Sequence, residues 1–195
     1  MQQLILGLAI FLGVHSIRIF AEDWRNARRA AMGEMAWKSA YSLLSLIGLV
    51  LIVVGYGQAR LSPTLLWVSP TWAAHLAALL TLLSFVLLVA AYVPGNAIKQ
   101  RLKHPMILGV KVWALAHLLA NGTLADVILF GSFLAWAVLC FRSARRREPA
   151  PVTGSASPLA TALTVAIGLG AWAVFAMWGH AALIGVRPFG MMPAG

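Results

Sequence analysis

The sequence has few charged residues and a single cysteine. Only 10% of its 195 residues are charged, whereas a soluble domain carries about 25% charged residues. This shortage excludes an ordinary soluble domain. Cys140, the one cysteine, excludes an internal disulfide and any zinc or iron–sulfur site built from cysteines. It stands at the end of an apolar run, and we interpret it as a packing residue.

Several catalytic and cofactor motifs are also absent. The chain contains no C-x-x-C-H, which excludes covalently attached c-type haem. It also contains no H-E-x-x-H, no glycine-rich phosphate loop and no G-x-S-x-G, so nothing indicates a zinc protease, a nucleotide-binding loop or a serine hydrolase. Any chemistry must therefore depend on side chains outside these motifs.

The residues that are present are mainly apolar. The chain is 61% hydrophobic, with a mean hydropathy of +0.86. Because a helix crosses the hydrocarbon of a bilayer with about 20 residues, we predict an all-α integral membrane protein with about six transmembrane helices in a bundle. It forms a single transmembrane domain over residues 1–195. The expected spans are 3–20, 37–57, 71–93, 105–120, 124–141 and 159–185.

Turn-forming and polar residues separate these runs. The turn residues 121–123 divide the fourth run from the fifth and predict a tight helical hairpin. Residues 147–158, REPAPVTGSASP, predict a polar linker before the last span. The first run has no basic segment before it and no small-residue cleavage site. We therefore expect it to be retained as a span rather than removed as a signal peptide.

The basic residues indicate an orientation. The formal charge of +10 is carried in short loops between apolar runs, so it favours contact with lipid head groups over nucleic acid. The loops after the first, third and fifth runs hold Arg18, Arg25, Arg28, Arg29, Lys38, Lys99, Arg101, Lys103, Arg142, Arg145, Arg146 and Arg147. The other side holds only Arg60 and Arg187. By the positive-inside rule, both termini should lie on the non-cytoplasmic side.

Polar residues within the spans are candidates for function, because they are costly in a membrane. The predicted topology places His15 and His104 toward the cytoplasmic side. It places His75, His117, His180 and Asp126 toward the other side, where the four can share one layer. Lys111, within the fourth run, either extends to the inner surface or serves an anionic group inside the bundle.

Each histidine also has a structural interpretation. His75 and His180 can be interfacial residues, and His104 can cap the helix that Pro105 begins. His15 and His117 have apolar residues on both sides, so we regard them as the stronger functional candidates. Trp113 lies one turn before His117 on the same face and either lines a pocket or packs in the core. Axial ligation of haem, a transition-metal site and a proton relay all remain open for these imidazoles.

Four segments resemble the NnrU family of bacterial inner-membrane proteins, which are linked to denitrification and nitric oxide metabolism. These are FLGVHSIRIF (11–20), YVPGNAIKQRLKHPM (92–106), WALAHLLANGTLADVILFG (113–131) and IGVRPFG (184–190). The family is similar to the 15-cis-zeta-carotene isomerases of plants and cyanobacteria, which hold b-type haem through histidines. The resemblance therefore implies a multi-pass protein of the bacterial inner (cytoplasmic) membrane that binds haem b.

The resemblance also implies roles for individual residues. His15, in VHS, and His117, in LAH, match the two haem ligands, with Trp113 close by. His104 matches the histidine of the His-Pro pair, and His104, His75 and His180 are reserve ligands. The implied activity is a haem-dependent isomerisation or redox step on a lipophilic molecule, with a possible redox partner, or nitric oxide sensing or maturation. Whether the chain is an enzyme stays open.

Two other functions fit the same residues. KHPM, with Lys103, His104 and Pro105, resembles the motif of the isoprenylcysteine and phospholipid methyltransferases, which bind S-adenosylmethionine. The chain lacks the aromatic residue that follows that motif, and Glu148 is the only acid after the hairpin. The other alternative is a non-enzymatic transporter or assembly factor that uses the histidines for passage of a substrate or metal.

Overall fold

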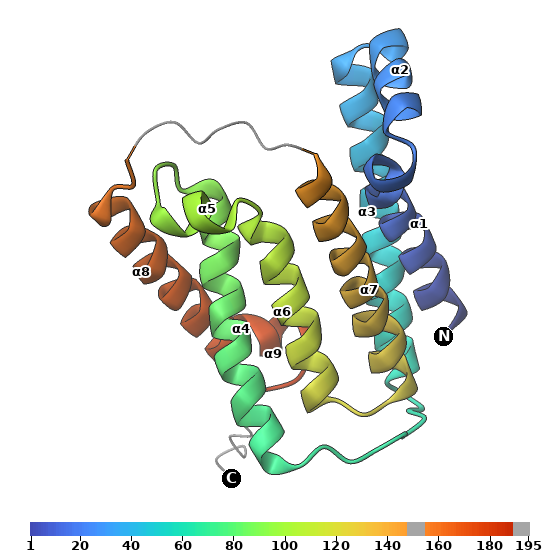
Figure 1. Cartoon of the computed structure of the whole chain (residues 1–195). Helices are drawn as coiled ribbons and strands as arrows, with labels where there is room; N and C mark the ends of the chain where they lie inside the picture. The colour runs from blue at the N-terminus through green and yellow to red at the C-terminus, as the bar shows by residue number, and fades with distance from the viewer. Residues whose placement is uncertain (148–154, 189–195) are drawn as a thin grey trace.

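The computed structural model describes residues 1–147 and 155–188, and within these ranges the fold is all-helical (Figure 1). Five helices are long and apolar enough to cross a membrane: α1 (Gln2–Phe20), α3 (Glu34–Ala59), α4 (Thr71–Tyr92), α7 (Leu124–Arg146) and the continuous run Pro158–Ile184. That last run comprises α8 (Pro158–Val174), the π-helix η1 (Phe175–Gly179) and α9 (His180–Ile184). The all-helical membrane fold is therefore confirmed.

The fourth expected span, 105–120, is a shorter helix. α6 (Pro105–Ala120) has 16 residues, because Pro105 begins it and the turn at Asn121 ends it. That length is below the roughly 20 residues of a full span. Residues 148–154 of the predicted linker and the last two residues of the motif at 184–190 lie outside the described part of the chain.

Most of these helices expose apolar side chains. In the apolar window of the last span, only 11% of the residues are buried, and in the first span 17%. Large exposed apolar patches are unfavourable in water. The apolar helices therefore indicate a lipid bilayer as the surroundings of this chain.

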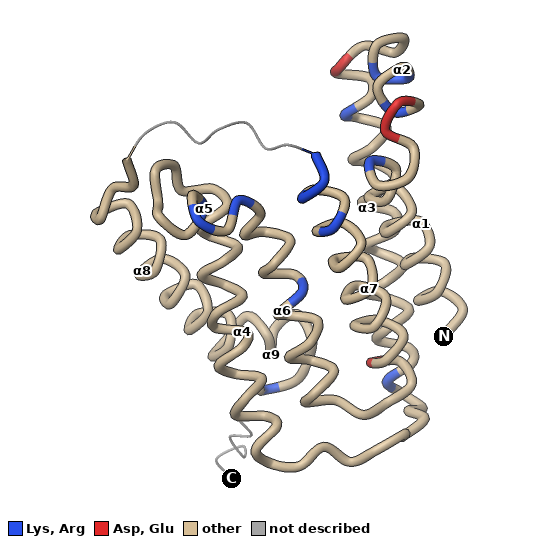
Figure 2. Tube along the Cα trace, in the orientation of Figure 1, with Lys and Arg blue, Asp and Glu red and all other residues tan. Residues whose placement is uncertain are grey.

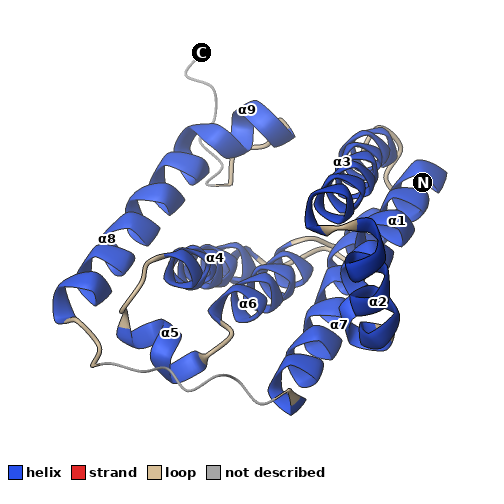
Figure 3. Cartoon of the chain, turned by 90° about the horizontal axis from the view of Figure 1, so that it is seen from above, coloured by secondary structure: helices blue, strands red, loops and turns tan. Residues whose placement is uncertain are grey.

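The long helices pack as a row of neighbours. α3 packs on α1, α1 on α7, α7 on α6, α6 on α4, and α4 on α8 (Figure 3). A buried apolar cluster joins α1, α3 and α7 through Leu4, Leu8, Ile52, Ala125, Leu129 and Phe130. The row brings residues of α1, α3, α6 and α7 together on one side and residues of α4, α6 and α8 on the other.

Glycine allows α1 and α3 to touch through their backbones. A methyl group added at Gly55 would overlap the backbone of Leu4, and one added at Gly7 would lie 2.6 Å from the backbone nitrogen of Ile52. Small residues at a helix interface allow this approach inside a membrane, where packing rather than exclusion of water drives association.

A short loop closes the end of the α6–α7 hairpin. The backbone N–H groups of Leu66 and Trp67 both donate to the carbonyl of Gly122, at 2.8 and 3.2 Å. Thr123 caps α7 and exchanges hydrogen bonds with Asp126, and the Tyr56 hydroxyl donates to Asp126 Oδ1 at 2.5 Å. The predicted tight turn is present, and Asp126 serves as a cap and a link to α3.

The charged residues gather at one end, which we call the basic end (Figure 2). It contains two short helices in segments where we expected only loops, α2 (Glu22–Met32) and α5 (Ala97–Leu102), and the end of α7. Away from it, Arg60 ends α3, and its guanidinium donates to the carbonyl of Ile184 at the end of α9. The three basic segments thus share one end, and the orientation of that end in the membrane stays a prediction.

The contact at Gly55 gives a test of the α1–α3 interface. We expect Gly55→Ala to destabilise the protein by about 1–3 kcal/mol, because the added methyl group has to push two backbones apart. Thermal unfolding in detergent measures the effect. Gly57→Ala, in the same helix with nothing within 4 Å of the added carbon, is the matched control and should leave stability nearly unchanged. Equal effects of both substitutions would contradict the close contact.

Candidate functional site: two cavities lined by histidines

A large cavity lies where α1, α2, α3, α6 and α7 meet, and we call it the basic-end cavity. Its volume is about 770 Å³, within the range of about 300–1,000 Å³ that is typical of cofactor and ligand sites. The side chains that matter for its chemistry are His15, Arg18, Arg25, Arg29, Lys38, Tyr41, His104, Trp136, Cys140 and Arg147. Cys140, which we interpreted as a packing residue, lines this cavity.

His15 is held by aromatic rings and one backbone carbonyl. Its Nδ1 lies 2.7 Å from the carbonyl oxygen of Phe11, one turn earlier in α1. With the proton assigned to Nδ1, the lone pair is on Nε2. The ring stacks on Phe11 at 4.2 Å, and its edge contacts are Tyr41 at 5.2 Å and Trp136 at 6.1 Å. These contacts fix the orientation of the imidazole.

His104 enters the cavity from the start of α6. Lys103 before it has φ 62, a left-handed conformation that is unusual for a residue with a side chain. This turn separates α5 from α6 and places His104 at the N-cap of α6. The Nε2 atom of His104 is buried and has no hydrogen-bond partner among the described residues, and the same holds for Nε1 of Trp136.

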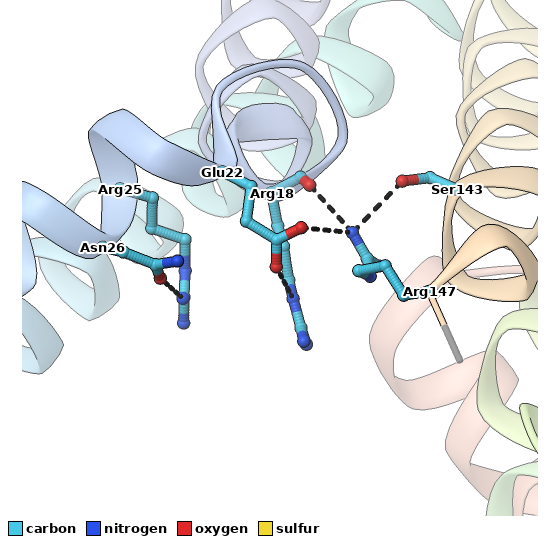
Figure 4. A network of polar contacts seen from close by, with 6 residues as sticks. All are labelled: Arg18, Glu22, Arg25, Asn26, Ser143 and Arg147. Atoms are coloured by element: carbon cyan, nitrogen blue, oxygen red, sulfur yellow. Dashed lines mark hydrogen bonds and ion pairs between the residues drawn. The ribbon is translucent and has the colours of Figure 1, made fainter. Parts of the chain in front are cut away.

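Five cations line the basic-end cavity, with two carboxylates to balance them. Glu22 pairs with Arg18 at 3.3 Å and with Arg147 at 3.4 Å. Glu34 pairs with Arg29 and Lys38 at 3.4 and 2.7 Å. The fifth cation, Arg25, donates to the neutral side chain of Asn26 at 3.0 Å (Figure 4). The lining therefore keeps an excess of positive charge.

Arg147 ties α7 to the segment between α1 and α2. Its Nη1 donates to the Arg18 carbonyl at 3.0 Å and to the Ser143 hydroxyl at 3.1 Å, besides its ion pair with Glu22 (Figure 4). Partial burial acts to raise the pKa of Glu22. The hydrogen bond from Arg18 and the charges of Arg147 and Arg18 nevertheless hold this pKa below its ordinary value.

A second, smaller cavity lies between α4, α6 and the last span, and we call it the aromatic cavity. Its volume is about 220 Å³. Its lining includes the side chains of Ala78, Thr81, Phe85, Trp113, His117, Asn121, Trp172, Phe175, His180 and Arg187. Aromatic rings and two imidazoles line it, together with several small residues.

The two imidazoles of the aromatic cavity are oriented in the same way as His15. His117 Nδ1 lies 2.9 Å from the Trp113 carbonyl oxygen, and His180 Nδ1 lies 2.7 Å from that of Val186. His117 stacks on Phe130 at 4.5 Å and packs against Trp113 at 5.1 Å. His180 directly follows the π-helix, an irregularity that often marks functional positions in helices.

The family of the chain follows from a comparison of the whole sequence. A family model described as NnrU protein matches residues 3–188. The chain belongs to the NnrU family. No curated protein and no solved structure matches it. Membership supports, at the level of the family, a denitrification-linked membrane protein with several passes through the membrane.

Within this NnrU-family chain, the structure brings together different histidines from those that the resemblance pairs. His15 shares its cavity with His104, and His117 shares its cavity with His180. Three rings, Phe11, Phe133 and Trp113, form a connected series between the imidazoles of His15 and His117. The pairing of these two histidines as ligands stays a prediction. Trp113 lines the cavity of His117, as a pocket residue would.

The other candidates take structural positions. His75 is exposed and lines neither cavity, and Asp126 is occupied as the cap of α7. Of the four residues expected in one layer, only His117 and His180 line a common cavity. The Lys111 ammonium lies 4.9 Å from the centre of the Phe141 ring. No group of three or more His, Cys, Asp or Glu residues in the described chain is arranged to hold a metal ion.

Sequence reasoning missed several of the lining residues. Tyr41 and Trp136 were not singled out, although both contact His15, and neither were Trp172 and Phe175 beside His180. Each lies in an apolar run where core or lipid contact is the ordinary role of an aromatic residue. Only packing between distant segments identifies them.

The Glu22 network predicts a dependence of stability on pH. Because the pKa of Glu22 is lower in the folded chain, its contribution is fully present above the unfolded-state pKa and is lost as pH falls through the folded-state pKa. We expect Glu22→Gln to lower the Tm at pH 7 by about 1–2 °C, as for an exposed ion pair. The difference from wild type should vanish well below pH 4.5, the ordinary glutamate value.

Thermal unfolding of both proteins across this pH range measures the effect. Asp23→Asn, one residue along α2 and outside the network of Figure 4, is the control for loss of a nearby negative charge. A Tm difference between wild type and Glu22→Gln that persists unchanged at low pH would rule out the ion pairs as its origin.

Proposed function

We propose that this NnrU-family protein binds b-type haem in the basic-end cavity, where His15 and His104 would hold the iron. One observation carries the proposal: His104, whose Nε2 is buried without a hydrogen-bond partner among the described residues, lines a cavity that His15 also lines. An unpaired buried polar atom is costly, so its presence points to a ligand. Facing helices of a bundle can present one histidine each to an iron atom.

The hydrogen bonding of His15 supports this assignment. Histidines that bind metal usually donate the other ring N–H to a carbonyl or carboxylate, which fixes the tautomer and directs the free nitrogen. The contact of His15 Nδ1 with the Phe11 carbonyl is of this kind. The rings of Phe11, Tyr41 and Trp136 around the imidazole would limit its rotation and exclude water.

The charge of the cavity also supports haem. Haem b carries two propionate groups, which are anionic at neutral pH, and this cavity has more cations than carboxylates. Arg25, whose side-chain partner Asn26 is neutral, is best placed to pair with a propionate. Guanidinium groups bind carboxylates in a two-pronged geometry. The basic residues would thus orient the macrocycle with its carboxylates toward the basic end.

The same charge is unfavourable for S-adenosylmethionine. That cofactor has a sulfonium and an ammonium group against one carboxylate, so its net charge is positive. A cavity lined by five cations would repel it. The methyltransferase function that the motif of Lys103, His104 and Pro105 resembles is therefore less favoured than haem binding. A transporter is also less favoured, because no specific observation supports it.

The proposed activity acts on a lipophilic molecule within the bacterial inner membrane, in connection with nitric oxide metabolism. Bound haem would supply an iron centre that changes redox state and exchanges a ligand. The protein residues would hold and orient the macrocycle, exclude water from it through the surrounding rings, and keep the His15 tautomer fixed through the Phe11 carbonyl. An isomerisation or a redox step both use these elements.

An absorption spectrum tests the proposal. Protein produced with ample haem should show a Soret band, and its absence would end the haem proposal. We expect His15→Ala and His104→Ala each to abolish or shift the band, because each removes one axial nitrogen. Haem affinity should fall by tenfold or more, which corresponds to a loss of about 1.4 kcal/mol or more of binding free energy.

Two further histidine variants decide between the ligand pairs. His117→Ala should leave the band unchanged if His15 and His104 are the ligands, and should abolish it if the pair of His15 and His117 is correct. His75→Ala is the matched control, because His75 is exposed and lines neither cavity. A band that survives in both His15→Ala and His104→Ala would place the haem elsewhere.

A further inference from the structure

The aromatic cavity has the size of a single substituted ring. Its volume is about 220 Å³. A buried apolar cavity of about 150 Å³ holds one benzene molecule. The space is therefore suited to one aromatic ring with small substituents and is too small for a porphyrin. Phe85, Trp113 and Phe175 offer ring faces or edges for such a ligand.

The polar groups of this cavity are mainly hydrogen-bond acceptors. His117 and His180 direct their Nδ1 atoms to backbone carbonyls, so each presents its Nε2 lone pair. Asn121 donates its amide N–H to the His117 carbonyl, which leaves its side-chain oxygen as an acceptor. A ligand that fits these groups must bring hydrogen-bond donors.

Two donors of the lining are engaged within the protein. Trp172 Nε1 donates to the Thr81 hydroxyl at 3.1 Å, and that hydroxyl donates to the Ala78 carbonyl at 3.0 Å. The guanidinium of Arg187 adds a positive charge to the lining. A neutral ring with hydroxyl groups meets these conditions, and the positive charge favours a ligand whose hydroxyl oxygens carry partial negative charge.

We propose that the aromatic cavity binds the head group of a membrane hydroquinone, with the Nε2 atoms of His117 and His180 accepting hydrogen bonds from its hydroxyl groups. A lipophilic hydroquinone dissolves in the bilayer that surrounds the apolar helices. Its ring stacks against the aromatic lining, and its hydroxyl groups supply donors to the two imidazole nitrogens. The site is separate from the basic-end cavity and does not depend on haem.

The hydrogen-bond pattern makes the site selective for the reduced form. A hydroquinone donates through two O–H groups, whereas the matching quinone has only acceptor oxygens. Placed against neutral imidazole nitrogens, the quinone oxygens would leave both sides without a donor, which is costly in a dry site. We expect the hydroquinone to bind about tenfold or more tightly than the quinone.

A transition-metal ion is the other ligand that imidazole lone pairs attract. The described residues place no third His, Cys, Asp or Glu with this pair. Protein zinc sites use at least three protein ligands. The aromatic side chains of the lining supply no further metal ligand, so a hydroquinone fits the cavity better. Binding of a metal ion is a separate outcome of the test.

Calorimetric titration of the full chain in lipid nanodiscs tests the proposal. The probes are trimethylhydroquinone, kept reduced without oxygen, trimethylbenzoquinone, and Zn²⁺ alone. We expect saturable binding of the hydroquinone at one site. His117→Phe and His180→Phe should each weaken it about tenfold, because each keeps an aromatic ring and removes one acceptor. His75→Phe, at an exposed histidine outside both cavities, should not change it.

A cavity-filling variant keeps the test decisive if a histidine variant fails to fold. Ala78→Phe places a ring in the cavity and leaves both imidazoles in place, so it should abolish hydroquinone binding. Any of three results would overturn the proposal. These are a lack of saturable binding to the wild type, equal binding of quinone and hydroquinone, and binding that Ala78→Phe does not change. Zn²⁺ binding that requires both histidines, without hydroquinone binding, would replace it by a metal site.

Discussion

An imidazole inside a membrane protein has to place its N–H on a hydrogen-bond acceptor, and this constraint governs the chemistry of both cavities. His15 and His117 meet it with the carbonyl one turn earlier in the same helix, and His180 meets it with the carbonyl of Val186. In each case Nδ1 is occupied and Nε2 is left as a base. The local backbone thus orients three polar residues that are costly inside a membrane.

The two cavities differ in charge and size, so they suit different ligands. The basic-end cavity, about 770 Å³, has an excess of cations and suits a large anionic cofactor. The aromatic cavity, about 220 Å³, is mainly apolar and suits one ring. A series of rings, Phe11, Phe133 and Trp113, lies between His15 in the first and His117 in the second. The fold therefore separates two chemical environments within one row of helices.

Much of the fold could be predicted from the sequence. The apolar runs and the turn at 121–123 gave the order of the helices, and the clustering of Arg and Lys gave a basic end that the structure also has. The short helices α2 and α5 were not predicted, because charged segments of this kind form helices only where caps and neighbours support them. Asn96 caps α5, and Glu22 joins α2 to Arg147. Asp126 was expected in one layer with three histidines, and its role as the cap of α7 was not predicted, because that role depends on its contacts with Thr123 and Tyr56.

The sequence by itself determined that this chain is helical, that it lies in a membrane, and that its histidines are the residues to examine. These conclusions depend on composition and on local order along the chain. The tertiary structure decided which histidines line a common cavity, His15 with His104 and His117 with His180. The position of a residue along a helix fixes its depth in the membrane and the face of the helix on which it lies. It does not fix which neighbouring helix packs against that face. That choice depends on the backbone contact of α1 with α3 at glycine and on the position of α6 between α4 and α7.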